Sequence, residues 1–154
     1  MAELRVYTTT TGGDKIEKIL KDAQQAERTG GVAIGFFASA KYEDGTPVAH
    51  VAHSHEYGLG VPERAFFRAS VRKMETELLG TLRDDLDTEK MAVSEKLADK
   101  LGAQGAGIVQ ETISNVDYSP APPLSPETIE RKGSSTPLID TGRMRQSVTW
   151  KTFK

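Results

Sequence analysis

The stretch His53–Arg68, HSHEYGLGVPERAFFR, joins a histidine-rich segment to the start of a long amphipathic pattern. Gly58 and Gly60 mark a turn, because glycine adopts backbone angles that other residues avoid. Pro62 then fixes the direction of the chain, and two consecutive phenylalanines follow at the start of the next pattern. We therefore expect this stretch to be an elbow from which the rest of the fold extends.

Two long helices are predicted after the elbow. Apolar residues recur every three or four positions over 65–86, and they recur again from about residue 88 to residue 114. Gly102, Gly105 and Gly107 fall inside the second helix, where each costs about 1 kcal/mol relative to alanine. They indicate either a kink or break in that helix, or a close approach of its backbone to the first long helix or to a neighbouring subunit.

The remaining pattern predicts strands at 3–9, at 32–38 with a possible extension to residue 40, and at 147–153, because apolar and polar residues alternate there. A helix starts at Asp14, and Thr46 can cap a short one with Pro47 in its first position. Further short helices are expected after Ser125 and after Asp140.

Together these elements predict a single α+β domain spanning 1–154. In it, a small antiparallel or mixed sheet packs against two long α-helices, with a proline-rich crossing and a C-terminal strand. We expect flexible tips at 8–13 and 42–46. The segment 118–126 is expected to be extended, because its prolines exclude regular helix and central strand.

Composition excludes several functional classes. The net charge is −2, with acidic and basic residues mixed along the chain, whereas nucleic-acid binding needs clustered lysine and arginine. Cysteine is absent, which excludes disulfides and thiol chemistry. No run approaches the ~20 apolar residues that a membrane span requires, and the N-terminal stretch does not have the pattern of a signal peptide. We expect a protein that is made in a cytoplasm and stays soluble, with no membrane partner.

The three histidines of the chain, His50, His53 and His55, stand together beside Glu56 and raise the question of a metal site. On a helix His50 and His53 lie about 60° apart while His55 points away from both, and on a strand only two of the three share a face. Leu59 stands where a zinc protease would have its second histidine. We favour polar surface or interface histidines, with a zinc or nickel site and a pH-sensitive contact as alternatives.

Other catalytic patterns do not match. The segment that begins at Gly12 lacks the spacing of a phosphate-binding loop, and no serine lies in a nucleophile elbow. The acidic residues are spread over helical surfaces. The sequence therefore predicts no catalytic, cofactor-binding or metal-binding residues, and a protein that is not an enzyme.

Three segments resemble one family, the neck or tail-completion proteins of long-tailed bacteriophages. His55–Gly58, HEYG, followed by 61–68, VPERAFFR, is similar to its "HEFG … IPARPFLR" stretch. Residues 123–129 with Lys132 resemble its "PLSPxTxxxK" stretch, and 137–148, PLIDTGRMRQSV, resemble its "PLxDTGxLRxSI" ending. The order of the segments also agrees. Tyr57 replaces the family's phenylalanine, and Ala65 stands where the family more often has proline.

The resemblance implies a structural subunit of the head–tail junction of a virion, made in the bacterial host cytoplasm. Such subunits form a homo-oligomeric ring, often a hexamer, between head connector or head-closure proteins and tail terminator or tail tube proteins. DNA would pass through the ring only as cargo, and no cofactor is implied. The alternatives are a tail terminator or head-closure protein, and a histidine-dependent metal-binding protein.

The same segments supply the candidate residues. Phe66 and Phe67 point in different directions at a helix start, so one can anchor the core while the other packs on a neighbour. Residues predicted to contact a subunit or partner are His55, Glu56, Tyr57, Arg64, Phe66, Phe67, Arg68, Arg143 and Arg145. Residues predicted to shape the motifs are Gly58, Pro62, Pro123, Asp140, Thr141 and Gly142, with Asp140 or Thr141 as a helix cap and Gly142 permitting close packing.

Overall fold

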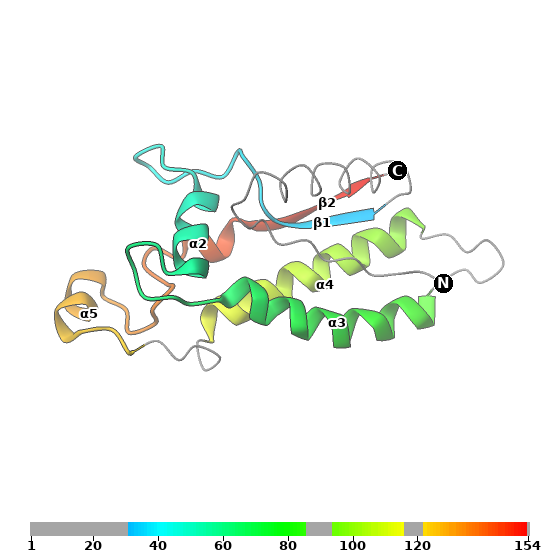
Figure 1. The fold of residues 1–154 in the computed structure, drawn as a ribbon. Helices are drawn as coiled ribbons and strands as arrows, with labels where there is room; N and C mark the ends of the chain where they lie inside the picture. Colours follow the sequence, from blue (N-terminus) through cyan, green and yellow to red (C-terminus); the bar gives the residue numbers. More distant parts are fainter. Residues whose placement is uncertain (1–30, 86–93, 116–121, 154) are drawn as a thin grey trace, which may run out of the picture.

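A computed structural model describes residues 31–85, 94–115 and 122–153 (Figure 1). The predicted strand at 3–9, the tip at 8–13 and the helix from Asp14 lie outside the described residues. Within them the order of elements is β1, α2, α3, α4, α5, α6 and β2, which confirms the α+β class.

The sheet consists of two antiparallel strands from opposite parts of the chain. β1 covers Gly31–Phe36 and β2 covers Val148–Phe153, with Gly31 opposite Phe153 and Phe36 opposite Val148. Both strands were predicted, but β1 ends two residues before the expected Ala38. It ends there because the chain turns, with the backbone N–H of Ala40 donating to the carbonyl of Phe37 at 2.9 Å.

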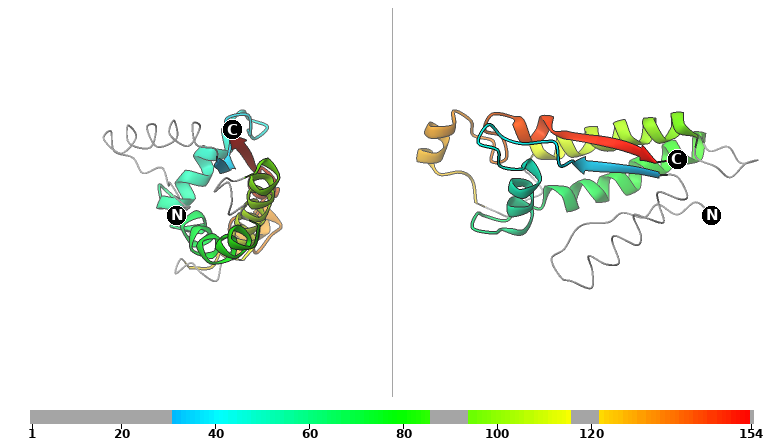
Figure 2. Two further views of the ribbon diagram at one scale, coloured as in Figure 1. Left: turned by 90° about the vertical axis from the view of Figure 1, so that its right-hand side faces the viewer. Right: turned by 90° about the horizontal axis from the view of Figure 1, so that it is seen from above.

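The two long helices are α3, Phe66–Asp85, and α4, Glu95–Ser114. α4 packs against α3 and against both strands, so it lies between them (Figure 1, Figure 2). α4 starts later than predicted, because the hydroxyl of Ser94 accepts from the backbone N–H of Leu97 at 3.2 Å and so caps the helix. Residues 88–93 of the predicted second helix lie outside the described residues.

The glycines of α4 do not break it. A Cβ atom on Gly102 would lie 2.2 Å from Cδ1 of Trp150, and one on Gly105 would lie 2.3 Å from Cδ1 of Ile34. Both glycines therefore let the helix backbone come close to a neighbouring element, which was one of the two predictions, and that element is mainly the sheet. Gly105 also faces the first long helix, since a Cβ there would lie 3.6 Å from Cδ1 of Leu78 in α3. An approach to another subunit stays a prediction. Gly107 faces open space.

Three short helices complete the described chain: α2, Val48–Tyr57, α5, Pro126–Lys132, and α6, Arg143–Gln146. The N-cap of α2 is Pro47, with no side-chain cap, so the expected capping by Thr46 was wrong. The Thr46 backbone N–H instead donates to a carboxylate oxygen of Asp44 at 2.9 Å, inside the turn of the 42–46 loop.

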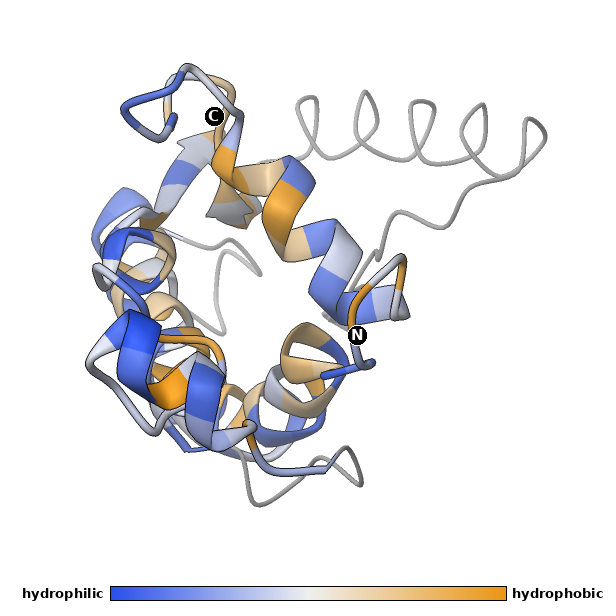
Figure 3. Ribbon diagram, turned by 90° about the vertical axis from the view of Figure 1, so that its left-hand side faces the viewer, coloured by the Kyte–Doolittle hydropathy of each residue, from blue (hydrophilic) through white to orange (hydrophobic). Residues whose placement is uncertain are grey.

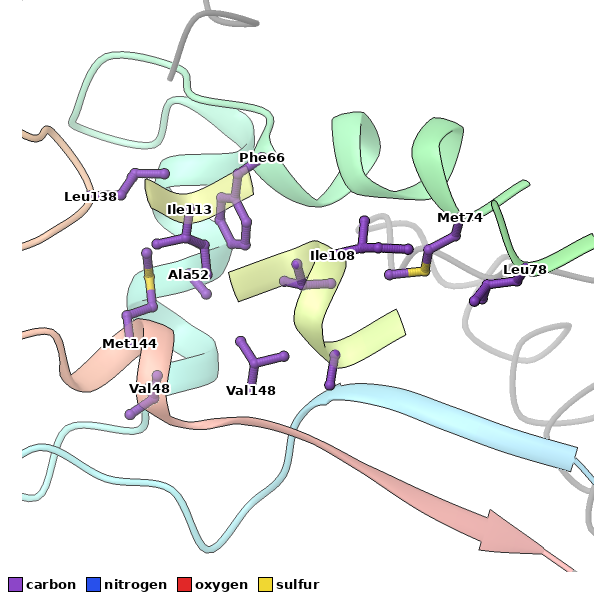
Figure 4. Packing of buried hydrophobic residues seen from close by; sticks show 12 residues of the cluster. Val48, Ala52, Phe66, Met74, Leu78, Ile108, Ile113, Leu138, Met144 and Val148 are labelled. Atoms are coloured by element: carbon purple, nitrogen blue, oxygen red, sulfur yellow. The ribbon is translucent and has the colours of Figure 1, made fainter. Parts of the chain in front are cut away.

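The core lies where these elements meet (Figure 4). Its largest members without polar side-chain atoms and with less than 2% exposure are Phe66, Ile113, Val48 and Val109. Leu138, Met144 and Val148 join them from the C-terminal part. No helix in the described parts of the chain is long and apolar enough to cross a membrane.

Candidate functional site

Glu56, in the last turn of α2, holds the start of α3. Its carboxylate accepts from the backbone N–H groups of Phe67 at 2.8 Å and Arg68 at 3.0 Å. These donors belong to the first turn of α3, where a helix has unpaired N–H groups and a partial positive charge. Glu56 is 5% exposed. A carboxylate from one helix thus caps the next one across the elbow.

Arg68 completes this connection. Its Nε donates to Glu56 Oε1 at 2.9 Å, and its Nη2 donates to the Glu56 carbonyl at 2.7 Å and to Glu63 Oε1 at 2.5 Å. The hydrogen bond with Glu56 is the main reason that the pKa of Arg68 is raised. The guanidinium also lies 5.4 Å from the centre of the Tyr57 ring, within cation–π range. Arg68 therefore ties both sides of the turn together.

Arg64 ties the elbow to the proline-rich crossing. Its backbone N–H donates to the His55 carbonyl at 2.7 Å, and its Nη2 donates to the Pro122 carbonyl, also at 2.7 Å. Only 4% of Arg64 is exposed. A buried guanidinium that binds a carbonyl from a distant segment fixes the position of that segment.

Phe66 and Phe67 point in different directions, and one of them anchors the core as expected. Phe66 is 1% exposed and meets Phe36 edge-on, with ring centres 6.2 Å apart, so it anchors the core (Figure 4). Phe67 is half-buried and covers Gly35, whose Cβ position lies 3.8 Å from the Phe67 ring. α3 begins at Phe66 although the residue before it is not the family's proline.

The burial corrects part of the predicted contact set. Glu56, Arg64 and Phe66 are buried by this chain itself, so their side chains are not available on the protomer surface for a neighbouring subunit. Each has its own task in the elbow: capping, anchoring the crossing, and filling the core. For the half-buried or exposed remainder a partner contact stays a prediction: His55, Tyr57, Phe67, Arg68, Arg143 and Arg145.

All three histidines lie on α2, but their surroundings differ. His50 is exposed, and the His53 ring lies 4.8 Å from that of Tyr57. His55 is half-buried, and its Nδ1 is fully buried without a hydrogen-bond partner. Burial lowers the pKa of His55, and the charges of Arg64 and Lys132 lower it further. Among the described residues, no three histidine or acidic side chains gather in a way that could hold a metal ion.

The turn after α2 explains two of the motif residues. Gly58 has φ +67° and ends the helix, with its N–H donating to the Ser54 carbonyl. A Cβ atom there would come within 3.1 Å of Glu63 Cβ, so both the backbone angle and the space require glycine. Pro62, which is exposed, lies between Gly58 and Arg64.

The second motif, at residues 123–132, forms an arm that includes α5. Ser125 caps α5 by accepting from the Thr128 N–H at 3.3 Å, and Pro126 occupies the first turn, as predicted. The Lys132 ammonium holds the end of α5 to the following loop by donating to the carbonyls of Thr136 at 3.2 Å and Pro137 at 2.9 Å. Pro123 is exposed.

The third motif forms the start of α6. The Thr141 hydroxyl accepts from the Arg143 N–H at 3.3 Å. The N-cap of α6 is Gly142, with no side-chain cap, so the expected capping by Asp140 or Thr141 was wrong. Gly142 has φ +75°, and a Cβ there would meet only an ordinary contact, so the backbone angle rather than close packing requires glycine. Arg143 Nε donates to the Lys41 carbonyl at 3.1 Å, and an Arg145 Nη donates to Ser114 Oγ at 3.3 Å.

The three motifs gather at one end of the molecule. The elbow, α5 and α6 lie together on the left of Figure 1, away from the far ends of α3, α4 and the sheet. The Arg64–Pro122 bond joins the first motif to the crossing directly before the second, and Leu138 and Met144 carry the third motif into the core that contains Phe66. Segments separated by up to about 80 positions in the chain thus build one surface.

Beside the elbow lies an open groove of about 260 Å³ between β1, α2 and the start of α3. Its walls are rich in aromatic side chains: Phe36, Phe37, Tyr57, Phe66 and Phe67. The sequence motifs do not reveal this groove, because Phe36 at the end of β1 and Phe37 directly after it lie outside the motifs. The alternation of apolar residues in β1 predicts a strand with an apolar face. It does not show which part of that face the other elements leave uncovered to form a groove.

Comparisons with protein-family models, with curated proteins and with solved structures gave no significant match to this chain.

Proposed function

We propose that this chain is a neck or tail-completion subunit of a long-tailed bacteriophage virion, where it forms a ring, most simply a hexamer. The ring joins the head connector or head-closure proteins to the tail terminator or tail tube proteins and lets DNA pass through its lumen. Its role is mechanical, and it has no catalytic step.

The observation that carries the proposal is the convergence of the three family-like segments at one end of the molecule. A chance likeness in three unrelated loops gives no reason for the loops to meet. Here Arg64 of the first segment binds Pro122, which directly precedes the second, and the third enters the same core. The convergence supports reading the segments as one functional surface.

The polar residues of the elbow also fit a structural role. The Glu56 carboxylate accepts hydrogen bonds from the backbone of α3 and from Arg68, and the Arg64 guanidinium donates to the Pro122 carbonyl. Side-chain groups that hold the backbone in this way contribute to the shape of the elbow. The elbow is therefore built to hold shape, which is what a ring subunit between two larger assemblies needs.

The test is an early stop codon in this gene within the phage that encodes it. We expect filled heads and complete tails that stay unjoined in the lysate, seen by electron microscopy, and infectivity restored when the intact gene is supplied in trans. The matched control is the same stop codon in a suppressor host.

Normal, infectious particles from the non-suppressing host would contradict the proposal. Empty or unassembled heads with no tails would place the defect at a different stage and would also contradict it.

A further inference from the structure

The aromatic groove is open and is lined by residues of β1, α2 and the start of α3. Ala49 is exposed on its α2 wall, and Phe37 and Tyr57 are half-buried. Lys151 lies 4.6 Å from the centre of the Phe37 ring, at the edge of the sheet. A groove with aromatic walls and this modest volume suits a few compact apolar side chains rather than a large ligand.

The chain also carries a segment with the complementary chemistry. Pro122, Pro123 and Pro126 are all exposed, and Pro123-Leu124-Ser125-Pro126 has two prolines three positions apart. Ser125 is the N-cap of α5 and is extended, with φ −65° and ψ 149°, and the helix begins at Pro126. Extended segments of this kind dock on aromatic-lined grooves, because proline is already ordered before binding.

The arm that presents this segment adds nothing to its own protomer's core. None of the α5 residues is buried, and α5 lies beyond the ends of α3, α4 and the sheet (Figure 1, Figure 2), at the end of the molecule that faces the viewer in Figure 3. A helix of seven residues has little stability alone. Its shape is held instead by the Ser125 cap and the Lys132 bonds. An arm that is fixed in shape and has no buried residue in its helix can form contacts with another molecule without unfolding its own protomer.

We propose that the groove of one copy of this chain binds the Pro122–Pro126 segment of a second copy. The segment of the same copy is held elsewhere, because Arg64 binds the Pro122 carbonyl at 2.7 Å. No residue of that segment is among the described residues that line the groove.

This contact joins two different surfaces, a groove and an arm. Such heterologous contacts extend from copy to copy and close into a ring when the rotation permits. The inference thus supplies the subunit contact of the ring, and it rests on the proposed function for the premise that copies associate.

The first experiment uses two variants that block opposite halves of the contact. Ala49→Lys places a long side chain in the groove at an exposed helix position, and Pro123→Ala/Pro126→Ala removes the docking prolines. The matched controls are Ala103→Lys, an exposed position of α4, and Glu130→Ala, an exposed position of the arm. Assembly is measured by mass photometry and sedimentation over a range of concentrations.

We expect each blocking variant to weaken association about tenfold or more, while both controls assemble like the wild type. An equimolar mixture of the two blocking variants retains one intact pairing, the segment of Ala49→Lys in the groove of the proline variant. It should give dimers and nothing larger.

The second experiment uses the absence of native cysteine. In the double variant Ala49→Cys/Pro123→Cys, oxidation should produce disulfide-linked dimers and larger ladders, whereas Ala103→Cys/Pro123→Cys should not. A disulfide only within one copy would overturn the second copy as occupant, as would a disulfide from Ala49→Cys to a cysteine placed in residues 1–30.

The outcomes separate the two proposals. Wild-type-like rings from Ala49→Lys overturn the groove contact and leave the neck function intact. A wild-type chain that stays monomeric at every concentration overturns the contact, and the stop-codon experiment then decides the function independently.

Discussion

Replacing Glu56 with alanine tests the elbow most sharply. The carboxylate accepts from two backbone N–H groups and from Arg68 Nε. Loss of a helix cap costs about 0.5–2 kcal/mol, and leaving donors unpaired at a buried site costs about 1–3 kcal/mol. The Arg68 side chain is 42% exposed, so its ion pair adds at most about 1 kcal/mol. We expect a loss of about 3 kcal/mol in the free energy of unfolding.

The assay is urea unfolding followed by the fluorescence of Trp150, the single tryptophan of the chain, which lies against Gly102 in α4. In thermal melts of Glu56→Ala followed by the same fluorescence, the melting temperature should fall by about 6–12 °C, since 1 kcal/mol corresponds to about 2–4 °C for a chain of this size. Glu56→Gln keeps the shape and one acceptor oxygen, so it should lose about two-thirds as much.

Glu111→Ala is the matched control, because the Glu111 side chain is exposed and forms an ion pair with exposed Lys73 at 3.1 Å. It should cost less than about 1 kcal/mol. If Glu56→Ala unfolds within about 1 kcal/mol of this control, the carboxylate does not hold α3, and the structural reading of the elbow is refuted.

Three further perturbations follow from the geometry. Gly102→Ala should destabilise the fold by about 1–3 kcal/mol, because the added Cβ would meet the rigid Trp150 ring. Gly107→Ala should stabilise the fold by up to about 1 kcal/mol. Thermal melts measure both variants, and equal effects would contradict the packing of α4 on the sheet. The pKa of His55 is lower in the folded chain than in the unfolded chain, so folding is favoured while His55 is neutral. This part of the stability is present above pH 6.5 and is lost as the pH falls below that value. His55→Gln should flatten the dependence of the unfolding free energy on pH, whereas His50→Gln should not, and an unchanged pH profile in His55→Gln would reject the assignment. Arg64→Met should speed proteolytic cleavage in the arm severalfold, because it releases Pro122. The control Arg72→Met, at an exposed position, should leave the cleavage rate unchanged. Equal rates in the two variants would show that Arg64 does not hold the proline-rich crossing in place.

Much of this fold follows from local patterns. The spacing of apolar residues in α3 and α4, and the alternation in β1 and β2, depend on periodicities that the chain displays by itself. Caps such as Ser125 with Pro126 are also local, because their partners lie within a few residues. These elements were therefore predictable, with differences of a few residues at their ends.

The misjudged residues depend on contacts between distant segments. Gly102 and Gly105 indicated either a kink or break in the helix or a close approach of its backbone. The partners in that approach are Trp150 and Ile34, which no local pattern reveals. Glu56 and Arg64 are charged, and charged residues are almost never fully buried unless paired. Their partners, the start of α3 and the Pro122 carbonyl, become visible only when the chain is folded.

The aromatic groove has the same origin. It forms where β1, α2 and α3 meet, and its residues come from three separate parts of the sequence. The histidine cluster shows the opposite case, since its geometry could be judged from helical spacing alone, and all three histidines do lie on one helix.

The most direct test of the neck proposal is an electron cryomicroscopy map of the virion that encodes this chain. We predict a ring of density at the head–tail junction into which α3, α4 and the two-stranded sheet fit, with the end that carries the elbow, α5 and α6 at contacts between subunits or with the adjacent layer. Neck density that other gene products fill completely, in particles from which mass spectrometry detects no peptide of this chain, would contradict the account.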